Sequence, residues 1–171
     1  MQTWEAIRSR RNVREFSDRP IADDHLDEIL ESGRRAPSSR NWQPWDFVVV
    51  RDRERLRKLS GVSPGAGHVA TAAAAIALVA PEPASELQRS RVQFDLGQTA
   101  MSLMLAAAGL SIGSGETGVA DQELARDLLG FPADRLCAYV ISLGYPTERP
   151  LTLIRRPDRR PLSEIVHRER W

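Results

Sequence analysis

Residues 37–45 read PSSRNWQPW and lead directly into the apolar residues 47–50, FVVV. This short stretch places two hydroxyls, a guanidinium and two carboxamides between Pro37 and Pro44. Proline fixes its own backbone angle, lacks an N–H donor and restricts the residue before it, so the segment is stiff and unsuited to a helix interior. We therefore interpret it as a rigid support that holds polar side chains in place ahead of a buried strand.

Length and composition predict one soluble domain that covers residues 1–171. The chain is 42% hydrophobic, and a chain of this length can bury one sizeable core. No apolar run reaches the roughly 18 residues that a membrane span needs. The N-terminus shows no apolar stretch followed by a cleavage site, so we expect a cytoplasmic protein. The single cysteine, Cys137, lies in an apolar run and is interpreted as a small buried hydrophobe.

Hydrophobic patterns and capping residues predict alternating helices and strands. We expect a short helix beginning near Thr3, a helix over residues 20–33, a helix capped by Asp52, and helices over residues 90–108 and 121–129. We expect strands over residues 45–50, 73–80, 110–112 and 135–143, although the many alanines of residues 73–80 leave a helix open for the first half of that run. Residues 61–67 and 113–118 are predicted as loops, and an arginine- and proline-rich tail with a short amphipathic piece at residues 162–166 ends the chain.

The predicted helix over residues 90–108 changes character along its length. Its first half is one-sided, with Val92 and Leu96 facing inward, but residues 100–108, AMSLMLAAA, are apolar almost all round. A helix of that kind is buried on both sides. Because one small domain offers few places to bury it, the pattern indicates a subunit interface.

Basic residues gather in two places although the net charge is only +1, and all but Lys58 of the 24 basic residues are arginine. Arg8, Arg10, Arg11 and Arg14 fall within seven positions, and residues 10–16 lack helical periodicity. If residues 10–16 are extended, Arg10, Asn12 and Arg14 point to one side, with Arg10 and Arg14 about 13 Å apart. The second group is Arg155, Arg156, Arg159 and Arg160. Arginine is the preferred partner of phosphate. A solvated surface is the alternative that remains open for any one of these side chains.

Five segments in order resemble one known family, the FMN-dependent nitroreductases. They are RSRRNVREF at residues 8–16, APSSRNWQPWDFVVV at 36–50, GLSIGSGETG followed by LLGFP at 109–118 and 128–132, ISLGYP at 141–146, and RRPLSEIVH at 159–167. The resemblance implies an α+β fold with a central mixed β-sheet flanked by helices. It also implies a homodimer with a C-terminal extension that crosses to the partner subunit, and two FMN sites at the interface.

The same resemblance implies which residues bind FMN. Arg10, Arg11 and Asn12 match positions that hold the phosphate and ribityl chain, Arg14 matches a basic residue at the pyrimidine edge of the ring, and Arg159 or Arg160 matches a C-terminal phosphate ligand. The partner subunit's contribution corresponds to the stiff segment, namely Pro37, Ser38, Ser39, Asn41 and Gln43. Gly115, Glu116, Thr117 and Gly118 match a loop whose backbone faces flavin N5 and O4.

In such an enzyme the cofactor carries the redox chemistry, which explains the lack of an obvious acid, base or nucleophile. The implied activity is oxidation of NAD(P)H and reduction of a nitroaromatic, quinone or similar small acceptor by a ping-pong mechanism, with Arg14 as an electrostatic stabiliser. His25, His68 and His167 show no metal-ligand spacing, so no metal site is predicted. Alternatives are a dehalogenating, flavin-consuming or deazaflavin-using enzyme of the same family, or a nucleotide-binding module; near-zero net charge argues against nucleic acid.

Overall fold

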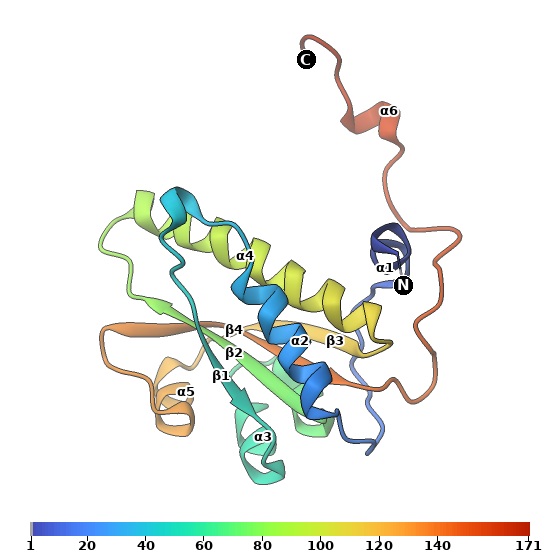
Figure 1. Ribbon diagram of the computed structural model, residues 1–171. Helices are drawn as coiled ribbons and strands as arrows, with labels where there is room; N and C mark the ends of the chain where they lie inside the picture. Colours follow the sequence, from blue (N-terminus) through green and yellow to red (C-terminus); the bar gives the residue numbers. More distant parts are fainter. Residues whose placement is uncertain (1) are drawn as a thin grey trace.

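A four-stranded antiparallel sheet forms the centre of the protein (Figure 1). The computed structural model describes residues 2–171. The strands are β1 (Asp46–Val50), β2 (Ala74–Pro81), β3 (Gly113–Gly118) and β4 (Arg135–Gly144), in the order β1-β2-β4-β3. Three of them confirm the strands predicted over residues 45–50, 73–80 and 135–143. All three strand pairings are antiparallel, and the sheet's mixed character is limited to one isolated parallel bridge, between Asn12 and Ser114.

Strand β2 explains the run of alanines, because it is buried on both faces. Side chains alternate along a strand, so Ile76 and Leu78 enter one hydrophobic cluster while Ala77 and Val79 enter the other. The first cluster includes α2 (Asp23–Arg34) and α4 (Glu86–Gly109), and the second includes α3 (Arg53–Leu59), η2 (Ala66–Thr71) and α5 (Gln122–Leu129). The helices thus form one layer on each face of the sheet (Figure 1).

Helix α4 is the longest element and crosses the whole molecule, about 36 Å at 1.5 Å per residue (Figure 1). It begins four residues before the predicted start because Ser85 accepts a hydrogen bond from the backbone N–H of Gln88 at 3.2 Å. Its inner side packs against α2 so closely that a Cβ on Gly33 would lie 2.6 Å from Cδ2 of Leu103. The fit of α2 against α4 therefore depends on glycine at this position.

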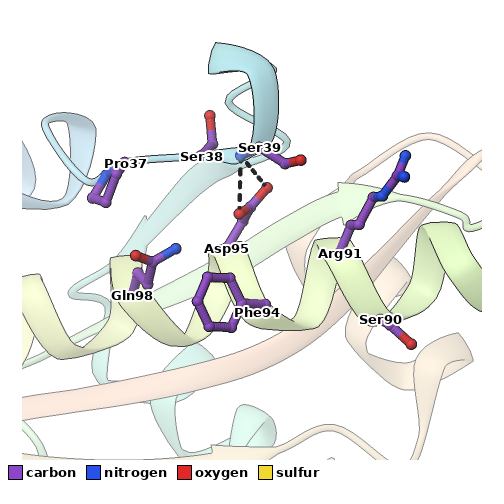
Figure 2. A pocket seen from close by; sticks show the side chains of 8 residues that line it. All are labelled: Pro37, Ser38, Ser39, Ser90, Arg91, Phe94, Asp95 and Gln98. Carbon is purple, nitrogen blue, oxygen red and sulfur yellow. Dashed lines mark hydrogen bonds between the residues drawn. The ribbon is translucent and has the colours of Figure 1, made fainter.

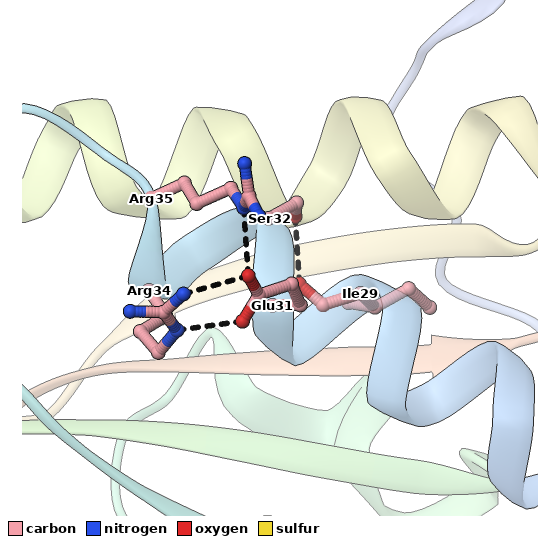
Figure 3. Close-up of polar contacts among 5 residues, drawn as sticks. All are labelled: Ile29, Glu31, Ser32, Arg34 and Arg35. Carbon is pink, nitrogen blue, oxygen red and sulfur yellow. Dashed lines mark hydrogen bonds and ion pairs between the residues drawn. The ribbon is translucent and has the colours of Figure 1, made fainter.

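The charged side chains at the end of helix α2 pair with one another. Glu31 accepts hydrogen bonds from Arg34 and Arg35 at 2.6–2.7 Å (Figure 3). The bonds from Arg34 and then Arg35 lower the pKa of Glu31 to about 2. Beside this group, the Ser32 hydroxyl lies 2.6 Å from the Ile29 carbonyl oxygen and 3.2 Å from that of Ser102 on α4. These two arginines are therefore occupied before the chain enters the stiff segment.

The capping residues Asp52 and Asp121 confirm two of the predicted helix starts. Each carboxylate accepts a backbone N–H in the first turn, from Arg55 at 2.8 Å and from Leu124 at 2.9 Å. The first helix, α1 (Thr3–Ser9), has Gln2 rather than Thr3 at its cap position. Within residues 2–171, no helix is both long and apolar enough to cross a membrane.

The sequence prediction is wrong between residues 110 and 118. Instead of a strand, Leu110 and Ile112 donate backbone hydrogen bonds to the last turn of α4, and Ser111 takes a positive φ of 61°. Instead of a loop, residues 113–118 form β3, paired with β4 from Gly144 to Tyr139. The glycine-rich segment has little intrinsic preference for a strand, and the neighbouring strand supplies the hydrogen bonds that order it.

The chain leaves the sheet after β4 and runs past α1 as an exposed tail, which projects away from the body (Figure 1). One backbone bond, from the Ile154 N–H to the Arg8 carbonyl at 2.9 Å, ties the tail to the end of α1. The short helix α6 (Leu162–Ile165) lies where the amphipathic piece was predicted. Its apolar residues Leu162 and Ile165, and Val166 directly after it, are exposed.

Candidate functional site

Residues 10–16 lie along the start of β3 as an extended segment. Val13 donates its backbone N–H to the Ser114 carbonyl at 2.8 Å, and Phe16 forms a bridge with Pro146. Val13 and Phe16 are buried, while Arg14 and Glu15 between them are exposed. The predicted extended conformation is confirmed, although strict alternation ends at Val13. Two buried anchors thus hold Arg14 at the surface beside the sheet.

The arginines of this segment have different partners. Arg10 donates through Nη1 to Oδ1 of Asn12 at 3.1 Å, so these two side chains share a side as predicted. Arg11 instead donates to the backbone carbonyls of Arg149 and Pro150, where the tail begins. Arg10 is therefore placed beside a neutral amide, whereas Arg11 fastens the tail to the segment.

A cavity of about 540 Å³ opens beside Arg14, between the segment and η2. Its lining includes Arg14, Glu15, His68, Thr71 and Thr147. His68 is buried, and its Nδ1 lies 2.7 Å from Oγ of Ser142 on β4. The cavity therefore joins a permanent cation, a buried imidazole and two threonine hydroxyls from three parts of the chain.

Residues 115–118, which were predicted to form one loop, lie in strand β3 and alternate between its two faces. Gly115 and Thr117 are buried, while Glu116 and Gly118 are exposed, as expected when successive side chains point to opposite faces. A Cβ on Gly115 would lie 3.0 Å from His68 Nδ1, and one on Gly65 would lie 3.5 Å from Thr117 Oγ1. Gly115 and Thr117 thus border the η2 side. Burial, followed by the charge of Glu116, raises the pKa of the Tyr139 phenol.

The stiff segment lies over the N-terminal half of α4. Residues 39–41 form the 3-10 turn η1 (Ser39–Asn41), and Arg40, Asn41 and Gln43 have positive φ angles of 54°, 57° and 52°. Gln43 closes the turn by donating its backbone N–H to Ser38 Oγ at 2.9 Å and its amide to the Asn41 carbonyl at 3.1 Å. Holding three non-glycine residues in the left-handed backbone region costs conformational free energy, and backbone strain of this kind is concentrated at functional sites.

Asp95 holds this segment in place. Its carboxylate is 1% exposed and accepts the backbone N–H of Ser39 at 3.0 and 3.1 Å (Figure 2). Between the segment and α4 lies a cavity of about 450 Å³, lined also by Pro37, Arg91 and Gln98. Figure 2 shows Arg91, Asp95 and Gln98 extending from α4 toward the stiff segment. The Ser38 hydroxyl points away from α4.

A single chain does not bring its two polar groups, residues 10–14 and residues 37–43 of the stiff segment, together. The stiff segment contacts α4 at Asp95, whereas α1, which leads into Arg10, lies beside Leu105 and Leu110. At 1.5 Å per residue these contacts are about 15–22 Å apart along the helix axis. Figure 1 shows the two groups toward opposite ends of α4. The tail residues Arg159 and Arg160 are exposed, and in the described part of the chain neither forms a hydrogen bond with Arg10.

Three residues of the site region were missed from the sequence: His68, Asp95 and Ser142. A signal for Asp95 was present, because Val92, Asp95, Leu96 and Thr99 have the spacing of one helix face, and a carboxylate on a buried face needs a partner. His68 and Ser142 are 74 residues apart and have no local signal. Within residues 2–171, no three His, Cys, Asp or Glu side chains are arranged to hold a metal ion.

Comparison with known proteins identifies the family. Residues 7–91 match the model of the Nitroreductase family. A protein of Archaeoglobus fulgidus with the provisional name NADH dehydrogenase/NAD(P)H nitroreductase is 37% identical over 169 residues, which cover 96% of both chains. The NADPH-flavin oxidoreductase of Vibrio harveyi is 26% identical over 99% of this chain and 74% of its own length.

Structural comparison agrees with these matches. The crystal structure of a provisional NADH oxidase from Clostridium acetobutylicum superimposes with a TM-score of 0.86 and 28% identity, covering 98% of this chain and all of the other. The fold is therefore that of the nitroreductases, with α+β architecture and helices on both faces of the sheet. The chain belongs to the Nitroreductase family.

Proposed function

We propose that this protein is an FMN-dependent NAD(P)H oxidoreductase that reduces a nitroaromatic, quinone or similar small acceptor and works as a homodimer. The observation that carries the proposal is the distance between the two polar groups. Residues 10–14 and residues 37–43 each present groups suited to one part of FMN, yet they lie about 15 Å or more apart along α4. A second copy of the chain would let each site take one group from each subunit.

The residues present fit FMN in charge and in hydrogen-bonding type. Arg10, with Arg159 or Arg160 from a tail, would hold the phosphate, because guanidinium groups make charge-assisted bonds to it. Asn12, Ser38 and Asn41 would bind the ribityl hydroxyls, since their side chains can both donate and accept. Prior ordering of the segment by Asp95 lowers the entropy cost of this contact.

FMN, when bound, supplies the two-electron chemistry that connects a nicotinamide to the acceptor. Arg14 would stabilise the negative charge that develops on the ring, because it is a fixed cation in a cavity walled partly by buried groups. The nicotinamide and the acceptor would occupy the same face in turn, which gives ping-pong kinetics. The names of the Archaeoglobus fulgidus and Vibrio harveyi relatives support NAD(P)H and flavin as the reactants.

The surface of α4 supports a dimer. Leu87, Phe94 and Met101 are spaced by seven residues and are 62%, 69% and 44% exposed. Residues seven apart share one helix face, so they form an apolar stripe. The exposed tail, with apolar residues on α6, would cover further surface by crossing to the partner subunit.

The test measures flavin content, oligomeric state and turnover. The protein is purified with added FMN, freed of unbound flavin and measured by visible absorbance, by analytical ultracentrifugation and by oxidation of NADH and NADPH with nitroaromatic and quinone acceptors. We expect one FMN per subunit, a dimer, and parallel double-reciprocal plots. A colourless protein to which added FMN does not bind, or a monomer that holds FMN tightly, would contradict the proposal.

A further inference from the structure

A chain of two hydrogen bonds runs from the cavity beside Arg14 into the sheet. It begins at His68 on η2, which is 6% exposed, and passes to Ser142 on β4, which is fully buried. His68 Nδ1 lies 2.7 Å from Ser142 Oγ, and that oxygen lies 3.2 Å from the carbonyl oxygen of Gly115 on β3. Three elements thus meet at one buried hydroxyl.

The chemistry of the hydroxyl decides where the imidazole proton lies. A carbonyl oxygen only accepts, so Ser142 uses its single hydrogen to donate to Gly115. Its oxygen then accepts from His68, which must carry its proton on Nδ1. Burial, followed by the charge of Arg14, lowers the pKa of His68, so the ring is neutral at pH 7. Nε2 is left as an acceptor.

Gly115 is required for this arrangement. A Cβ at position 115 would lie 2.5 Å from the Val13 carbonyl oxygen and 3.0 Å from both His68 Nδ1 and Ser142 Oγ. Any larger residue would therefore separate the imidazole from the hydroxyl or push the segment containing Val13 off the sheet. The glycine of this motif is explained by a contact within the chain.

His68 and Arg14 line the same cavity, and within residues 2–171 the Nε2 atom forms no hydrogen bond. A ligand edge placed there would meet a fixed cationic donor beside a neutral acceptor. The ring of oxidised flavin has a single N–H, at N3, and a carbonyl on each side of it. This sequence of acceptor, donor and acceptor on the ring is complementary to an arginine next to an imidazole nitrogen.

We infer that His68 binds the flavin ring by accepting a hydrogen bond from its imide N–H, and that Ser142 is a positioning residue that keeps the imidazole in the Nδ1–H form. The inference rests on the proposed function, since it requires FMN in this cavity. It assigns to His68 a role in recognising the cofactor ring beside Arg14, in addition to its place in the core.

The first test needs no cofactor. Nitrogen-15 NMR of the full chain at pH 7 reports the protonation of each imidazole, and His25 and His167 serve as internal controls. We expect a protonated Nδ1 and an unprotonated Nε2 for His68, and loss of this preference in Ser142→Ala. A proton on Nε2, or a doubly protonated ring, in the unsubstituted protein would overturn the inference.

The second test measures dissociation constants for FMN and for FMN methylated at N3, by quenching of flavin fluorescence. Removal of the acceptor in His68→Leu should weaken FMN binding by roughly three- to tenfold, the usual net contribution of a hydrogen bond. The unsubstituted protein should discriminate against the methylated flavin, and His68→Leu should discriminate less. His68→Gln, which keeps an acceptor, should recover part of the affinity, and His25→Gln should bind as the unsubstituted protein does.

Thermal unfolding without flavin shows whether each variant is folded. If His68→Leu does not fold, His68→Gln and the methylated flavin on the unsubstituted protein decide. Equal affinity of the unsubstituted protein for the two flavins, or unchanged FMN affinity in a folded His68→Leu, would overturn the role of His68 alone. Failure of the unsubstituted protein to bind FMN at all would instead remove the proposed function and this inference together.

Discussion

Arg14 is the residue on which the electrostatic argument depends. The competing interpretation is a surface ion pair with Asp18 or Glu15. Asp18 pairs instead with Arg53, at 3.2 Å, and within residues 2–171 Arg14 forms no salt bridge. Its charge nevertheless acts on the buried His68, whose pKa it helps to lower. The Arg14 guanidinium is therefore free to face a ligand in the cavity it lines.

We predict that Arg14→Gln lowers the midpoint potential of bound FMN. Reduction adds negative charge beside the guanidinium, so loss of the cation disfavours the reduced form more than the oxidised form. A loss of about 1.4 kcal/mol corresponds to about 30 mV for a two-electron couple. A potentiometric titration measures this shift. Arg19→Gln is the matched control, because Arg19 stacks on Tyr145 nearby. An unchanged or higher potential in Arg14→Gln would show that the role is wrong.

At the scale of the element, the stiff segment is ordered by its neighbours as much as by its prolines. The positive φ angles of Arg40, Asn41 and Gln43 place it in a conformation that these residues rarely adopt. The backbone hydrogen bonds that Ser38 Oγ and the Asp95 carboxylate accept maintain that conformation. Asp95 is buried inside the interface between the segment and α4, so its hydrogen bond is shielded from water.

We predict that Asp95→Ala destabilises the protein by about 1.5–3 kcal/mol, the usual cost of losing a hydrogen bond to a charged group. Because the segment is then less ordered, FMN affinity should fall while turnover at saturating FMN changes less. Urea unfolding and flavin fluorescence measure the two effects. Asp121→Ala removes a helix-capping carboxylate from α5 and should cost about 1 kcal/mol without changing FMN affinity. Equal FMN affinities in the two variants would contradict the assignment to Asp95.

At the scale of the whole molecule, α4 separates residues 10–14 from residues 37–43 and also presents the apolar stripe of Leu87, Phe94 and Met101. Both features are consequences of a helix that crosses the entire molecule (Figure 1). A large exposed phenylalanine on such a helix is unusual for a monomer and typical of an association surface. Assembly and cofactor binding should therefore be lost together.

We predict that Phe94→Glu converts the dimer to a monomer, because a carboxylate is costly to bury in an apolar interface. Since each site would need both subunits, FMN should be released at protein concentrations at which the unsubstituted dimer retains it. Sedimentation velocity with detection at protein and flavin wavelengths follows both events. Arg57→Glu, which adds a carboxylate on the exposed side of α3, should leave both unchanged. A Phe94→Glu monomer that keeps its flavin would refute the shared site.

Local patterns were sufficient for much of the fold. The β-branched residues of β1, the short apolar run of β2 that stops at Pro81, and the apolar run of β4 predicted three of the four strands. Asp52 and Asp121 predicted two helix starts, and five ordered segments indicated the Nitroreductase family, which the comparisons confirm. The identities of the FMN-binding residues, the homodimer and the cytoplasmic location stay predictions.

Only the tertiary structure decided the rest. Residues 113–118 become a strand because β4 supplies their hydrogen bonds, although glycine has no preference for that conformation. His68 and Ser142, distant in sequence, become one hydrogen-bonded pair because η2 and β4 meet at Gly115. Side-chain type and periodicity report on bonds between near neighbours, whereas a buried polar contact between distant residues exists only after the chain has packed. The protonation state of His68 is set in the same way, by burial and by Arg14.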